Sequence, residues 1–62
     1  MSSREVIRRL QAAGWRHART RGSHWVFQHD EVPGRVVVPH PKRDIPIGTL
    51  RAIERASGVA LR

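Results

Sequence analysis

A chain of 62 residues forms one small domain, and this one carries 12 basic and five acidic side chains, a net charge of +7. A chain of this length buries only about 60% of the surface that its unfolded form exposes, so its core is small. It has no cysteine, which excludes disulfides and thiolate metal sites and suits a reducing compartment. No apolar run approaches the length of a membrane span, and no signal peptide opens the chain. We therefore predict a single soluble, cytoplasmic domain over residues 1–62 with a polyanionic partner, nucleic acid first.

The first predicted element is a helix from about Ser3 to Ala13. Ser2 and Glu5 have the spacing of a capping box. The apolar residues that then recur on one helical face are Val6, Ile7, Leu10 and Ala13. Gly14 supplies the left-handed position that ends a helix, and Trp15 just beyond it can fold back on the last turn.

Three strands are expected next, at Trp15 to Thr20, Ser23 to His29 and Arg35 to Val38. Arg21-Gly22 is a turn signal between the first two, which form a hairpin. A polar stretch then leads to the third strand, whose residues are mostly β-branched. Pro39 closes this strand because proline cannot donate to a ladder.

A second helix follows a rigid basic loop. Asp44 can cap this helix, with Pro46 in its first turn and Gly58 at its end. The apolar residues recurring along it are Ile47, Leu50 and Ile53. The order α-β-β-β-α predicts an α+β fold, in which both helices cover one face of a three-stranded antiparallel sheet and the opposite face stays open.

Histidines are the side chains best suited to proton transfer near neutral pH in this chain, which has no cysteine or tyrosine. His24 begins the second strand, directly after the turn and close to Arg21, so it is the first candidate, although such a residue more often has a surface or capping role than a catalytic one. His40 lies between two prolines, where a loop-stiffening role is favoured over a second proton transfer. His24 and His29 are expected on opposite strand faces without a carboxylate pair, so we predict no metal site.

Period-two alternation places Trp25 and Phe27 on one face of the second strand and His24 and Val26 on the other. Together with Trp15, the two aromatic residues are interpreted as core rather than as platforms for base stacking. His24 then faces outward. Val26 on the open face indicates either a bent strand or a partner that covers it.

Basic residues gather in two places. Lys42 and Arg43 form part of a proline-rich loop that can clamp phosphates, and Arg21 and Arg19 can do the same beside His24. Eleven of the twelve basic residues are arginine, which binds phosphate in bidentate fashion, although a GC-rich genome would favour the same residue.

These motifs, read in order, resemble the HicA family of bacterial toxins. The resemblance covers about Arg4 to Gly58. The motifs that carry it are Gly14-Trp15, Arg21-Gly22-Ser23-His24 before Val26-Phe27, Val38-Pro39-His40-Pro41, Asp44-Ile45-Pro46, Gly48-Thr49-Leu50, Ile53 and Ala56-Ser57-Gly58. The chain departs from the pattern at Trp25, where many relatives have a second histidine, and in its longer stretch over residues 30–34.

The resemblance implies a fold similar to the double-stranded RNA-binding domain and a ribosome-independent endoribonuclease that cleaves mRNA, with His24 as the catalytic residue. It also implies a HicB-type antitoxin that covers His24, in a hetero-oligomer with a toxin that is monomeric alone. We expect Arg21, Ser23, Lys42 and Arg43 to bind RNA, and we expect no cofactor. The alternatives are a non-catalytic RNA-binding module and a small DNA-associated basic protein.

Overall fold

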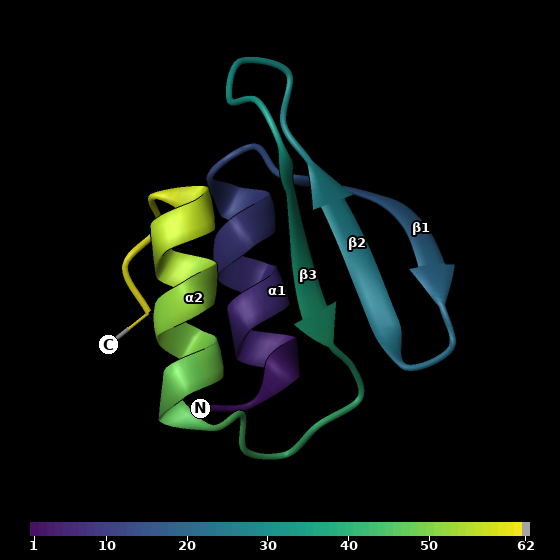
Figure 1. Cartoon of the computed structure of the whole chain (residues 1–62), viewed down its shortest axis with the longest axis vertical. Coiled ribbons are helices and arrows are strands. Elements are labelled where there is room, and N and C mark those ends of the chain that lie inside the picture. The colour runs from purple at the N-terminus through teal and green to yellow at the C-terminus, as the bar shows by residue number, and fades with distance from the viewer. Residues whose placement is uncertain (62) are drawn as a thin grey trace.

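The elements follow one another as a helix, three strands and a second helix, which confirms the expected α+β order (Figure 1). The computed structural model describes residues 1–61. The elements within them are α1 (Ser3–Ala12), β1 (Arg16–Arg21), β2 (His24–Gln28), β3 (Arg35–Pro39) and α2 (Ile47–Ser57). The hairpin turn is Gly22-Ser23, one residue later than predicted, since Arg21 still pairs with His24.

The start of α1 is fixed by the serine that the capping-box spacing predicts. Ser2 Oγ accepts the backbone N–H of Glu5 at 3.2 Å. The return contact of a capping box is absent among residues 1–61, because the Glu5 carboxylate accepts from Arg8 and Arg9 instead. The first turn of α1 is thus capped on one side only, and Glu5 links two arginines of the helix.

The end of α1 sets the position of the first strand. Gly14 has a φ of 95°, its N–H donates to Gln11 O, and the N–H of Trp15 donates to Leu10 O. These two bonds satisfy the last carbonyls of the helix in the Schellman arrangement. Trp15 is used in this motif and is 2% exposed, so β1 begins after it, at Arg16.

The sheet is antiparallel throughout, in the order β1-β2-β3. β2 and β3 pair without interruption, from His24 opposite Pro39 to Gln28 opposite Arg35. Because residues directly opposite each other share a face, this register assigns every side chain of the two strands to one side of the sheet.

One extra residue interrupts the pairing of β1 with β2. His17 lies opposite Phe27 and Arg19 lies opposite Val26, so Ala18 forms a β-bulge. The bulge reverses the alternation along β1. His17 before the bulge and Thr20 after it therefore point to the same side of the sheet, although they are three residues apart rather than two.

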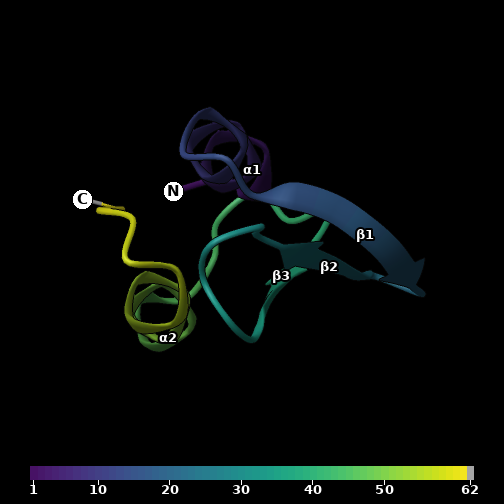
Figure 2. The same cartoon turned by 90° about the horizontal axis from the view of Figure 1, so that it is seen from above.

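The core lies between the helices and one face of the sheet, which we call the core face. Its buried members are Val6, Ile7, Leu10, Trp15, Phe27, Val36, Val38, Ile45, Leu50, Ile53 and Leu61. Both helices contribute, as the sequence predicts, but Ala13 and Ile47, which were expected on their apolar faces, are exposed. The helices lie on the β3 side of the molecule (Figure 2). β1 extends beyond them, and all six of its residues are exposed.

The interpretation of Trp25 as a core residue is only partly right. Trp15 and Phe27 are fully buried, but Trp25 is half-buried and packs at the margin of the core. Its strand lies next to β1, which the helices do not cover. One side of the Trp25 ring therefore contacts a side chain of β1, the ring of His17, rather than a helix.

The predicted cap of α2 is wrong. α2 begins at Ile47 with Pro46 as the N-cap residue and without a side-chain cap. Asp44 lies two residues ahead of this cap, too far to reach the first turn, and its carboxylate binds the N-terminal ammonium of Met1 at 2.8 Å. Gly58 ends the helix in the left-handed conformation, as expected.

Candidate functional site

His24 stands on the open face of the sheet, the face opposite the core. It is the first residue of β2, directly after the Gly22-Ser23 turn, and it is exposed. Within residues 1–61 no side chain hydrogen-bonds its ring. An imidazole held on a paired strand end and free of partners can meet a ligand from solvent.

Two adjoining hollows meet at His24. The larger, of about 550 Å³, is here called the arginine hollow, and it is lined by Arg19, Arg21, His24, Val26, Arg35 and Val37. The smaller, of about 380 Å³, is called the lysine hollow, and it is lined by His24, Val37, Pro39, Lys42, Pro46 and Thr49. His24 and Val37 line both hollows, so an extended ligand crossing from one to the other passes the imidazole.

Neither hollow is lined by an acidic side chain. The ion pairs found within residues 1–61 join Arg8 and Arg9 to Glu5, Arg16 to Asp30 and the N-terminus to Asp44, and none of them includes a cation that lines either hollow. The N-terminal ammonium lowers the pKa of Asp44 and so keeps that carboxylate charged. The open face consequently carries unpaired positive charge around His24, which favours an anionic ligand.

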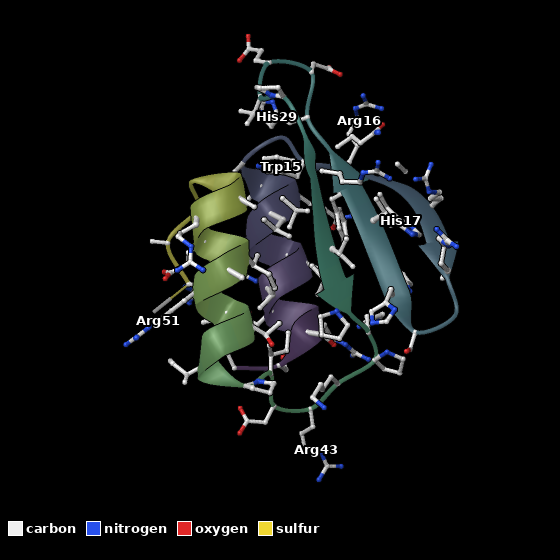
Figure 3. The ribbon with its side chains drawn as sticks, in the orientation of Figure 1. Trp15, Arg16, His17, His29, Arg43 and Arg51 are labelled. Atoms are coloured by element: carbon white, nitrogen blue, oxygen red, sulfur yellow. The ribbon has the colours of Figure 1, made fainter. Side chains whose placement is uncertain are left out.

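The RNA-binding residues expected from the sequence are divided by the structure. Arg21 and Lys42 line the two hollows with His24. Ser23 is exposed in the turn, where its carbonyl accepts the N–H of His40. Arg43 extends away from the body of the molecule in the loop before α2 and lines a separate hollow with Arg4 (Figure 3).

Sequence reasoning missed three residues that line the hollows: Arg35, Val37 and Thr49. Arg35 and Val37 alternate with the core residues of β3, so the period-two pattern contained the signal for their orientation. Thr49 carries no such signal, because its position depends on how α2 packs beside β3.

His40 lies on the other side of the sheet from His24. Its Nδ1 is 2.7 Å from Ser3 Oγ, and its ring meets the edge of Trp25 with centroids 4.5 Å apart. Ser3 is 1% exposed, and its hydroxyl oxygen also accepts the N–H of Lys42 at 2.8 Å. His40 is thus fixed to α1 and the core margin, an arrangement that suits the loop-stiffening role.

The remaining histidines make structural contacts. His17 stacks on Trp25 with ring centroids 4.0 Å apart and an interplanar angle of 8°, and its Nε2 is 2.8 Å from Thr20 Oγ1. His29 Nδ1 accepts the N–H of Glu31, so its Nε2 carries the proton that it donates to Ala13 O at 3.0 Å. In Figure 3 both rings lie apart from Arg43 and its loop. No group of three or more His, Asp or Glu side chains able to hold a metal ion occurs within residues 1–61.

The fold and the site together define a class of protein: a small basic domain that carries an exposed histidine between two cationic hollows. Residues 3–59 match the family model described as the HicA toxin of bacterial toxin–antitoxin systems. A solved structure described as a HicA3 and HicB3 toxin–antitoxin complex contains a chain 33% identical to this one, with complete coverage of both chains and a TM-score of 0.78. No curated protein matched the chain. The chain belongs to the HicA toxin family, as the motifs of its sequence predict.

No helix within residues 1–61 is long and apolar enough to cross a membrane.

Proposed function

We propose that this chain is a toxin that acts as an endoribonuclease, cleaving mRNA without the ribosome and without a metal ion, with His24 as the catalytic residue. The observation that carries the proposal is the position of His24. An exposed imidazole lies where two hollows meet, and cations from β1, β3 and the loop after β3 surround it without a lining carboxylate. RNA supplies the remaining component, a 2′-hydroxyl beside each phosphate.

In the proposed reaction the 2′-oxygen attacks the neighbouring phosphorus and loses its proton to a base. The bond between phosphorus and the 5′-oxygen breaks, and that oxygen takes up a proton. The products are a 2′,3′-cyclic phosphate and a 5′-hydroxyl end. His24 carries one of the two proton transfers, as base toward the 2′-hydroxyl or as acid toward the leaving oxygen. Arg21 and Lys42, on either side of His24, stabilise the charge that develops on the phosphate.

The test of this role is cleavage of a purified, defined RNA by His24→Ala, free of ribosomes. Proton transfer by a positioned side chain contributes about 10²–10⁴ in rate, so we expect a loss of that size or larger. The ring has no partner to lose within residues 1–61, so circular dichroism is expected to show an intact fold. His17→Gln is the matched control, because His17 is an exposed strand histidine outside both hollows, and it should cleave at the wild-type rate. Wild-type cleavage by folded His24→Ala would reject the catalytic role.

The chemistry has its own test. Cleavage is expected to persist in EDTA, to fail at a site bearing a single 2′-deoxy substitution, and to leave cyclic or 3′-phosphate ends. Recovery of 5′-phosphate ends, or activity lost in EDTA and restored by magnesium, would contradict the mechanism. A folded chain that binds RNA without turnover would instead identify a non-catalytic RNA-binding module.

We also propose that a HicB-type antitoxin binds this chain and covers His24. The similar solved chain belongs to a complex described as HicA3 with HicB3, which supports a partner of that type. An acidic partner would associate rapidly with the basic open face, in a salt-sensitive manner. A structure of the complex with His24 fully exposed to solvent would reject occlusion of the site.

A further inference from the structure

The arginine hollow contains more than proton transfer at His24 requires. Beside the imidazole and Arg21 it has a floor of two valines and two further cations, Arg19 and Arg35. We propose that this hollow is a binding subsite for one unpaired nucleotide of single-stranded RNA, next to the bond that is cut. The inference rests on the proposed function, and it adds the strandedness of the substrate and the residues that hold it.

The floor of the hollow is apolar although it lies on the open face. Val26 is already buried, at 4% exposed, although it is outside the main core cluster, and Val37 beside it is 43% exposed, so Val37 supplies most of the apolar surface that a base can cover. The register puts the two valines directly opposite each other in β2 and β3. A nucleobase can cover such a floor only with its flat face, and in a duplex that face is already stacked on its neighbours. The floor therefore favours an unpaired base.

The cations flank this floor from both outer strands. Arg19 lies opposite Val26 in β1, so that Arg19, Val26 and Val37 form one row across the sheet. Arg35 is on β3, two residues before Val37, and lines the same hollow. A base seated on the valines would thus have guanidinium groups on both sides, positioned for the phosphates that precede and follow it.

The next row across the sheet is the one that contains His24, with Arg21 and Pro39 opposite it. Strand residues rise by about 3.3 Å each, so the two rows lie about 7 Å apart. This separation is comparable to the size of a nucleotide. A base on the valine row consequently places its neighbouring phosphate near the imidazole, and the chain continues into the lysine hollow.

Binding measured by fluorescence anisotropy tests the subsite without cleavage, in full-length His24→Ala with a labelled single-stranded RNA and with the same strand in a duplex. We expect the single strand to bind more tightly. Adding Arg19→Gln and Arg35→Gln should weaken its binding by about tenfold or more and reduce the slope of log K against log salt by about 1.4, or about 0.7 for each phosphate contact.

A second variant separates the base from the phosphates. Val37→Thr keeps a branched side chain suited to a strand but makes the floor polar, so it should weaken single-strand binding several-fold and leave the salt slope unchanged. The matched control is Arg51→Gln, because Arg51 projects from α2 on the side away from the strands (Figure 3). It should leave single-strand affinity close to that of the parent.

The outcomes are decisive in either direction. Tighter binding of the duplex, affinity unchanged by Arg19→Gln with Arg35→Gln, or affinity unchanged by Val37→Thr would each overturn the subsite. Failure of the proposed catalysis looks different, because His24→Ala would then cleave RNA at the wild-type rate while these binding differences persisted.

Discussion

Gly14 is a residue whose backbone and surroundings both require glycine. Its φ is 95°, and a Cβ there would lie 2.8 Å from Nε2 of the His29 ring. The left-handed region alone costs an L-residue about 1–2 kcal/mol, so Gly14→Ala should lower the free energy of unfolding by at least this amount. Gly48→Ala is the matched control and should raise it by up to about 1 kcal/mol, because Gly48 lies in α2 with open space around it. Urea unfolding followed by circular dichroism measures both, and equal midpoints for the two variants would contradict the prediction.

Ser3 joins parts of the chain that are far apart in sequence. Its buried hydroxyl accepts from Lys42 N–H and lies against His40 Nδ1, and its own N–H donates to Lys42 O. Ser3→Ala would leave buried polar groups without their partner, at a cost of about 1–3 kcal/mol. Ser23→Ala, an exposed serine, should change stability by less than about 0.5 kcal/mol. Thermal unfolding of the two variants makes the comparison, and a Ser3→Ala midpoint equal to that of Ser23→Ala would show that the hydroxyl contributes nothing.

The orientation of His24 could be predicted at the level of single residues, whereas the partner of His40 could not. Period-two alternation within β2 is a local rule, and it correctly places His24 and Phe27 on different faces of the sheet. The contact of His40 with Ser3 spans 37 positions in the chain and depends on how the loop packs against α1. No local pattern encodes such a contact.

α1 carries a carboxylate whose charge stabilises the fold. Hydrogen bonds from Arg8 and Arg9 lower the pKa of Glu5 from 4.5 to about 2. Because the folded state favours the charged form, this stabilisation is complete above about pH 4.5 and is lost as the pH falls toward 2. Glu5→Gln lacks the titrating group, so its urea midpoint should fall less than that of the wild type between pH 6 and about pH 2.5. Asp44→Asn, measured in parallel, separates the contribution of Asp44, the other carboxyl group whose pKa is lowered. An identical acid dependence in Glu5→Gln and wild type would reject the assignment.

Element types could be predicted from the sequence because each element carries its own signals. The helices have capping or glycine signals and apolar faces, and β3 has a β-branched run. The predicted cap of α2 was wrong because the helix begins only at Ile47, with Pro46 as its N-cap residue, which leaves Asp44 too far away and able to bind the N-terminal ammonium instead. The bulge at Ala18 also has no local signal, since it is defined by the pairing of β1 with β2.

For the whole molecule, the distribution of charge matters more than its sum of +7. Lys42 and Arg43 are adjacent in sequence, yet only Lys42 lines a hollow that contains His24. Lys42→Gln should therefore slow RNA cleavage by about tenfold or more and reduce the salt slope of binding by about 0.7. Arg43→Gln removes the same formal charge and should leave the cleavage rate nearly unchanged. Equal loss of rate in the two variants would mean that net charge, rather than position, determines activity.

The bulge at Ala18 divides β1 into two halves that are held in place by different contacts. The half before it is held by the Arg16–Asp30 ion pair and the stacking of His17 on Trp25. The half after it leads into the hairpin turn, and its pairing with β2 fixes the positions of Arg19 and His24. Loss of the extra residue would restore regular pairing and leave both halves facing as they do now, because His17 would still lie opposite Phe27 and Arg19 opposite Val26. The chain between α1 and the hairpin can therefore change in length by one residue at this point while Arg19 and His24 keep their orientation on the open face.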